Sequence, residues 1–263
     1  MNLGISGLST AKAALATYVK VDGMKLGLHE DVQQFMTGKA KILPRIPKYQ
    51  QIWDPQQVID FLITWSPAKY LSLLHLSMKT VTMLLLVSGQ RPQILNFLTL
   101  DNMEQKRTSF KFTIQQNLKH SRAKTPATVV SISAFPGDKR VCPVNYLKAY
   151  LSRTEKLRNS RKIFISTTTP HEAASLSTMT RWIKNILNLA GIDTTVFSAG
   201  STRAAAANAA DRAGVPLQTI MAKAAWQTPT TFNKWYKKPL TQSSDKTYQK
   251  AILSKSSRTK ERK

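Results

Sequence analysis

The sequence predicts a mainly α-helical fold into which a small antiparallel β-sheet is inserted, an α+β arrangement. Two observations favour this class. Apolar residues recur at helical spacing over most of the chain, but between residues 108 and 135 they alternate with polar residues, as in half-buried strands. Start and stop signals also bound the helical stretches, with Asp54-Pro55 before one of them and Gly191 after another.

The first 50 residues are predicted to form a small helical domain that ends in a linker. TAKAALATYVK has an Ala-rich helical composition, and LHEDVQQFMTG is a second amphipathic piece that we expect to end at Gly38. The stretch KAKILPRIPKYQQ follows, with prolines and basic residues typical of a connection. We therefore divide the chain into a domain at 1–50, a larger domain at 51–240 and a basic tail at 241–263.

The larger domain is predicted to begin with two helices. After Asp54-Pro55, the residues Val58, Phe61, Leu62 and Trp65 fall on one helical face. A second helix runs through MKTVTMLLLV and stops at Ser88-Gly89.

Three strands are predicted next. TSFKFTI and ATVVSISAF alternate apolar with polar residues, and KIFIS is a short third strand. The basic stretch QQNLKHSRAKTP joins the first two as a hairpin-like loop.

Helices are predicted again towards the C-terminus. Met179, Trp182, Ile183, Ile186 and Leu187 mark one helix, which ends at Gly191. STRAAAANAADRAG is an Ala-rich helix, and Pro216 opens another through LQTIMAKAAW.

The net charge indicates a polyanionic partner, and nucleic acid is the first candidate. The formal net charge is +25, from 39 Lys and Arg against 14 Asp and Glu. A membrane surface is the rival, but no apolar run approaches the roughly 18 residues of a spanning helix. The single cysteine, Cys142, and four scattered histidines argue against a disulfide framework or a metal centre. No secretory signal is visible, so we expect an intracellular protein without metal or cofactor.

Five side chains from distant segments make a set suited to attack on a phosphodiester: Arg91 in VSGQRP, Lys119 in the acid-free hairpin, Arg203 in GSTRAA, Trp226 and Tyr236. Two guanidinium groups can hold phosphate oxygens in forked geometry. An amine can protonate the departing sugar oxygen, and an indole N–H can donate to phosphate. A phenol can attack phosphorus and form an ester.

The ordered strings SGQRPQIL, LKHSR, FSAGSTRAAA and AAWQTPTTFNKWYKKP resemble the catalytic domain of tyrosine recombinases of the phage-integrase type, closest to those of DIRS-like retroelements. The resemblance spans residues from about 50 to 240, and residues 1–50 resemble a truncated end of the family's helical core-binding, DNA-binding domain. It implies that Arg91 and Arg203 clamp the phosphate, that Lys119 is the general acid and that Trp226 stands where the family has His or Trp. Tyr236 then becomes the nucleophile of a site-specific DNA recombinase or integrase, forming a 3′-phosphotyrosyl link.

Two positions depart from the family pattern. Gly200 stands three residues before the second arginine, where the family usually has a histidine (or a lysine), and the histidine is given the role of accepting the proton of the attacking tyrosine. Ile94 occupies a position where many relatives carry an acid that supports the first arginine. Both departures put full activity in doubt.

The resemblance also implies double-stranded DNA as the partner, a homotetramer on that DNA, a transposable-element origin and a nuclear location, to which the basic ending SKSSRTKERK could contribute. Basic residues of the hairpin region and around Tyr236 are expected to contact DNA: Lys111, His120, Arg122, Lys124, Lys234 and Lys237.

Three other functions stay open at this point. Gly200 favours a catalytically decayed DNA-binding protein that keeps the fold. DRAGVPLQTIMAKAAW has the rhythm of a helix-turn-helix transcription regulator. A type IB topoisomerase would use similar chemistry as a monomer.

Overall fold

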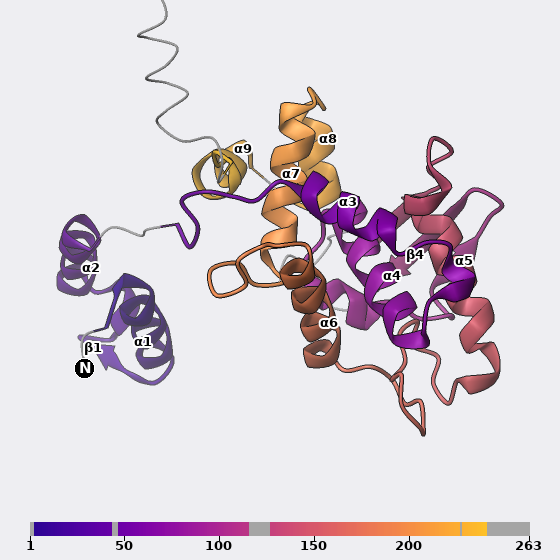
Figure 1. Cartoon of the computed structure of the whole chain (residues 1–263). Helices are drawn as coiled ribbons and strands as arrows, with labels where there is room; N and C mark the ends of the chain where they lie inside the picture. Colours follow the sequence, from indigo (N-terminus) through magenta and orange to yellow (C-terminus); the bar gives the residue numbers. More distant parts are fainter. Residues whose placement is uncertain (1–2, 44–46, 116–126, 227, 241–263) are drawn as a thin grey trace, which may run out of the picture. The chain divides into compact units, whose positions relative to one another are not determined.

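The computed structural model describes residues 3–43, 47–115, 127–226 and 228–240 (Figure 1). The chain separates into two compact units, residues 1–48 and residues 49–263. Each unit is described by itself below.

The first unit is a pair of helices around a short hairpin. It contains α1 (Ile5–Tyr18), the paired strands β1 (Lys20–Val21) and β2 (Met24–Lys25), η1 (Leu26–Leu28) and α2 (Glu30–Ile42). The prediction that a helix ends at Gly38 is wrong: α2 continues for another turn into the expected linker. Gly38 does not have the positive φ that lets a glycine end a helix. Within the described part of this unit only Ile5 is buried.

The helices of the second unit surround a buried central helix. α3 starts as predicted, with the Asp54 carboxylate accepting from the Gln56 N–H and proline at the first helical position. α4 is buried on almost every side and ends at Gly89, whose φ of 63° closes the helix in the left-handed region. The helices in this unit are α3 (Pro55–Thr64), η2 (Ala68–Tyr70), α4 (Leu73–Ser88), η3 (Pro92–Phe97), η4 (Lys139–Val141), α5 (Pro143–Thr154), η5 (Glu155–Leu157), α6 (Leu176–Leu189), α7 (Ser201–Arg212), α8 (Leu217–Ala224), α9 (Pro229–Thr231) and the π-helical turn η6 (Phe232–Tyr236).

A three-stranded antiparallel sheet of order β3-β4-β5 lies beside these helices: β3 (Met103–Gln105), β4 (Ser109–Ile114) and β5 (Thr128–Ser133). Phe112 of β4 pairs with Met103 on one side and Val130 on the other. The alternation predicted for β4 and β5 is observed, because Phe110, Phe112 and Ile114 are buried while Lys111 is exposed.

The third predicted strand, KIFIS, is wrong. Lys162 makes one isolated bridge with Thr99, and Ile165 makes another with Ala173. This stretch is apolar because the chain passes through the core, where Ile163, Phe164 and Ile165 are all buried. The third strand of the sheet is instead β3, which is too short to show an alternating pattern.

The fold class is confirmed as mainly α with a small antiparallel sheet. One large apolar cluster fills the second unit, and a smaller one joins Ala207, Ile220, Ala224, Trp226 and Phe232 at the C-terminal helices. Tyr236 packs against both clusters. None of the helices in the described ranges is long and apolar enough to cross a membrane.

Candidate active site

The candidate site is built around the first turns of α7, an Ala-rich helix whose start is fixed by buried hydrogen bonds. The Trp53 indole donates to Ser201 Oγ (2.8 Å), and Ser201 Oγ donates to the Ser198 carbonyl (2.7 Å). The hydroxyl groups of Tyr49 and Ser198 are hydrogen-bonded, with their oxygens 2.9 Å apart. Residues from the start of the second unit therefore hold the turn that places Arg203 on the first turn of α7.

Arg203 is a buried cation whose donors are unused within the described structure. Its side chain is only 2% exposed, and none of its three guanidinium nitrogens has a hydrogen-bond partner among the described residues. Its Cζ lies 4.7 Å from the ring centroid of Trp226 and 5.7 Å from that of Tyr236. Aromatic faces stabilise a cation in part, but they do not replace hydrogen-bond acceptors. The arrangement suits an anion supplied from outside the chain.

The electrostatics around Arg203 support this interpretation. Burial and, as a smaller cause, the nearby positive charge of Arg91 together lower the pKa of Arg203 from 12.5 to about 10, while Tyr236 opposes the shift. Arg91 follows the left-handed cap of α4 and precedes η3. Two guanidinium groups thus act on one another across segments far apart in sequence, which is unfavourable unless an anion lies between them.

Trp226 and Tyr236 complete the cluster from the C-terminal side. α8 ends at Ala225, whose φ of 50° turns the chain so that Trp226 is buried. The Trp226 and Tyr236 ring centroids are 4.4 Å apart, and Tyr236 is half-buried at the end of η6. Trp226 Nε1 is also buried without a hydrogen-bond partner in the described part of the chain. Unused buried donors of two residues therefore lie beside one phenol.

The remaining predicted residues are placed differently. Lys119, His120, Arg122 and Lys124 lie outside the described residues. Lys111 is on β4, where its Nζ lies 3.4 Å from Glu104 Oε1. Lys237 pairs with Asp211 at 3.1 Å, and Lys234 is exposed. Among the described residues no group of three His, Cys, Asp or Glu side chains could hold a metal ion.

Gly200 sits at the N-terminal cap of α7, with φ −69°. A Cβ built at this glycine would meet only Ser198 Oγ, at an ordinary contact distance of 3.7 Å. Neither the backbone nor the neighbours therefore require glycine here. Ile94, the other departure, is buried in η3.

Sequence reasoning did not single out Asn208, which is buried on α7 and contacts the backbone of Tyr236. A polar residue inside the run AAAANAA was the only signal that could have pointed to it. It also missed Lys79, which is buried in α4.

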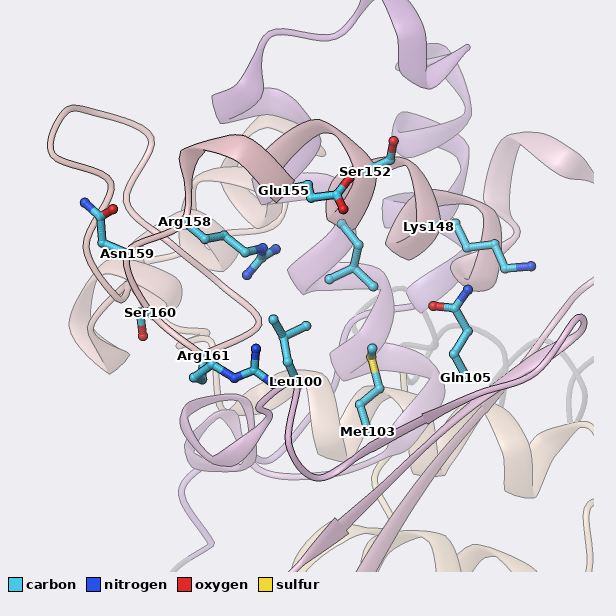
Figure 2. Close-up of a pocket in the computed structure, with 11 residues that line it drawn as sticks. Leu100, Met103, Gln105, Lys148, Ser152, Glu155, Arg158, Asn159, Ser160 and Arg161 are labelled. Atoms are coloured by element: carbon cyan, nitrogen blue, oxygen red, sulfur yellow. The ribbon is translucent and has the colours of Figure 1, made fainter.

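A pocket of about 900 Å³ holds none of the predicted site residues (Figure 2). Leu100 and Met103 line it together with several cations that the chain already engages. Arg161 pairs with Asp101 at 2.7 Å, and Arg158 donates to the Lys162 and Ile163 carbonyls. These bonds explain the cations as structural, so the candidate site remains the cluster around Arg203.

The model of the phage integrase family matches residues 55–243. The search of curated proteins gave no match. Similar solved structures are the XerH site-specific recombinase bound to palindromic difH substrate in a post-cleavage complex (13% identity, TM-score 0.58, covering 96% of this chain and 67% of that one), XerH bound to difH in a pre-cleavage complex (10%, 0.53, 95% and 70%) and the XerA recombinase (14%, 0.53, 97% and 83%). At these identities the likeness concerns the fold, and it confirms the fold that the resemblance implied.

Proposed function

The chain belongs to the phage integrase family, and on that basis we propose that it is a site-specific DNA recombinase that cuts and rejoins strands through Tyr236. The single observation that carries the proposal is the buried, unpartnered guanidinium of Arg203 stacked against the Tyr236 and Trp226 rings. A buried charge without acceptors costs free energy, which a phosphate diester bound at the site would recover.

In the proposed reaction, Tyr236 Oη attacks phosphorus and forms an O–P bond while the bond from phosphorus to the 5′ oxygen breaks. The phenolic proton leaves to an acceptor, and the 5′ oxygen takes a proton from an acid, for which Lys119 is our candidate. The product is a 3′-phosphotyrosyl ester and a free 5′-hydroxyl. Attack by a 5′-hydroxyl reverses every step, so no energy source is required.

Arg203 and Arg91 would hold the two non-bridging oxygens, where negative charge grows in the transition state. Trp226 Nε1 is a donor without a charge of its own, suited to one of the same oxygens. In this proposal the donors come from three separate segments: Arg91 from the turn after α4, Arg203 from α7 and Trp226 from the turn after α8.

We propose double-stranded DNA as the partner, supported by the net charge of +25. XerH was solved with its difH substrate before and after cleavage. Exchange between two duplexes cuts four strands, each needing one tyrosine, so we propose a homotetramer on DNA. Residues 1–50 would belong to a helical core-binding, DNA-binding domain. A DIRS-like transposable-element origin and a nuclear location remain part of this proposal, on the strings SGQRPQIL and AAWQTPTTFNKWYKKP and on the basic tail.

The test is covalent capture. The protein is mixed with a pool of duplexes that carry a randomised stretch and a nick, so that the cut strand diffuses away, and adducts are resolved on a denaturing gel. We expect an adduct that Tyr236→Phe abolishes. The matched control is Tyr70→Phe, since Tyr70 is an exposed phenol with Lys69 Nζ 4.6 Å from its ring centroid. An adduct that persists in Tyr236→Phe would overturn the assignment of the nucleophile. Relaxation of supercoiled plasmid by the monomer would favour a topoisomerase.

Gly200 favours one second candidate, a DNA-binding protein that has lost catalysis. DNA binding without any adduct would support it. We expect instead that Gly200→His raises the rate of adduct formation by at least about tenfold, because a proton acceptor typically contributes more than that and a Cβ is accommodated at this position. Gly200→Gln, similar in size but unable to accept a proton, is the control. A rate that Gly200→His leaves unchanged would count against our account of this position.

A further inference from the structure

Tyr236 is carried by an element that cannot fix its orientation alone. η6 is a π-helical turn of 5 residues, from Phe232 to Tyr236, and the Lys237 N–H closes it by donating to the Phe232 carbonyl (2.8 Å). Short helical segments are marginal without tertiary contacts, and π-helical turns are rare. Because displacement by about 1 Å can cost about a hundredfold in rate, something outside η6 must hold this residue.

Asn208 supplies that contact. It is 2% exposed and lies on α7, the helix that also carries Arg203. Its Nδ2 donates to the Tyr236 carbonyl, and its Oδ1 accepts from the Lys238 N–H at 2.8 Å. The amide therefore holds the backbone on both sides of Lys237, as a neighbouring strand would.

The same amide is tied into its own helix. Asn208 Nδ2 also donates to the Ala204 carbonyl at 2.7 Å, one turn earlier and next to Arg203. Both amide donors and the carbonyl oxygen are thus engaged, which fixes the side chain completely. A carboxylate of the same shape would place an oxygen against the Tyr236 carbonyl, so the amide is the chemistry that this position requires.

Two further contacts restrain the segment that follows the tyrosine. The Ile52 N–H donates to the Pro239 carbonyl at 2.9 Å, and Lys237 Nζ lies 3.1 Å from Asp211 Oδ2, a surface pair in which Lys237 is exposed and Asp211 is partly buried. Surface ion pairs contribute little, about 0–1 kcal/mol. The Asp211 pair therefore offers a matched comparison on the same helix and the same segment.

We propose that Asn208 is a positioning residue for the nucleophile: by pairing with the backbone at Tyr236 and Lys238, it keeps the phenol in place relative to Arg203. The inference rests on the proposed function. It predicts that loss of the amide slows attack on phosphorus without weakening DNA binding.

The experiment measures the rate of adduct formation at saturating nicked DNA, DNA affinity and thermal stability for the full chain. We expect Asn208→Ala and Asn208→Thr to lower the rate about a hundredfold and to leave DNA affinity unchanged. The threonine keeps a hydroxyl that can bond the helix carbonyl at Ala204 but cannot reach Tyr236, so it isolates the contact of interest. Asp211→Asn should change the rate by less than about fivefold.

A substrate with sulfur in place of the bridging 5′ oxygen separates positioning from proton transfer, because a thiolate leaves without an acid. The defect in both Asn208 variants should persist on this substrate. Recovery of the rate on it, or loss of thermal stability with an unchanged rate per folded molecule, would overturn the proposal. If the wild-type chain itself forms no adduct, the proposed function fails instead, so the two failures are distinguishable.

Discussion

Two buried cations in the second unit are treated in opposite ways. Lys79 of α4 is fully buried, and its Nζ donates to the carbonyls of Leu62 (2.6 Å), Trp65 (2.8 Å) and Arg140 (2.7 Å). Arg203 of α7 is almost as buried, yet no described residue accepts a hydrogen bond from it. Burial alone therefore says nothing about role, whereas the acceptors around the charge do.

The groups around Lys79 satisfy its ammonium and make it a structural contact. Leu62 and Trp65 present the carbonyls at the end of α3, where a positive charge is favourable, and the Tyr146 ring centroid lies 3.9 Å from Nζ. Arg203 has the aromatic contacts without the acceptors. Lys79 thus joins α3, α4 and η4, whereas the Arg203 guanidinium has no acceptor among the described residues, and we propose that its donors serve a ligand.

The largest expected effect is on the rate of adduct formation in a variant of Arg203, and it distinguishes a ligand-binding cation from a structural one. Arg203→Met should lower the rate of adduct formation by about 10²- to 10³-fold, because a donor to the developing negative charge is lost. Its thermal stability should stay the same or rise, since an unpaired buried charge is replaced by an apolar side chain. Arg212→Met, on the exposed end of the same helix, is the control and should affect neither. A clear loss of stability in Arg203→Met would mean that Arg203 is a structural cation like Lys79.

Lys79→Met is the mirror experiment. It leaves three buried carbonyls without their donor, so we expect the free energy of unfolding to fall by about 2–4 kcal/mol. The rate of adduct formation per folded molecule should not change. Denaturant unfolding and active-site titration on the same samples give both quantities. A slow but fully stable Lys79→Met would contradict the distinction drawn here.

The sequence singled out Arg203 as a candidate site residue but did not single out Lys79 as a buried structural cation. Arg203, Trp226 and Tyr236 were found because each occupies a place in an ordered series of short strings. Lys79 lies in MKTVTMLLLV, where nothing local tells a buried lysine from a solvated one. Its three acceptors lie 17, 14 and 61 positions away from it and meet it only in the folded chain. Asn208 was missed for the same reason, because its partners at Tyr236 and Lys238 lie 28 and 30 positions away.

For the fold, local patterns worked where they were long enough. The alternation that predicted β4 and β5 spans six residues in each strand. β3 has only three residues, so a period of two cannot be recognised. KIFIS was misassigned because a segment buried on all sides and a central strand have the same apolar composition. The turn of η6 has no sequence signature that distinguishes it from an α-helix.

Titration of Lys79 should also make the free energy of unfolding depend on pH. The three carbonyl acceptors favour the charged form of Lys79, but burial lowers its pKa from 10.5 to about 7, so between these values the folded chain loses this proton while the unfolded chain keeps it. The free energy of unfolding should therefore rise with pH across this window, by at most about 1.4 kcal/mol per pH unit, the limit for one proton. Arg203, with its pKa lowered from 12.5 to about 10, contributes mainly above about pH 10, at the upper end of that range and beyond it.

Unfolding by denaturant between pH 7 and 9.5 measures this slope. Lys79→Met should flatten it, and Arg203→Met should leave it as in the wild type. Burial raises the pKa values of Tyr146 and Tyr150, so ionisation of these phenols in the unfolded chain lowers the slope towards the top of the window, and the comparison between variants is drawn below that end. An equal slope in Lys79→Met and the wild type would show that the charge of Lys79 does not change in this range.

The smallest expected effect concerns salt. Binding of duplex DNA should weaken steeply as salt rises, because each phosphate neutralised by the protein releases counterions. In a Tyr236→Phe background, which binds without reacting, Arg203→Met should reduce the slope of log K against log salt by about 0.9, the contribution of one phosphate contact. Lys79→Met should leave the slope unchanged, since its Nζ is already bonded to three carbonyls. If both variants keep the wild-type slope, Arg203 does not contact a phosphate in the bound state, and its unpaired donors need another explanation. If the slope falls only in Lys79→Met, the structural and the ligand-binding role have been assigned to the wrong cations.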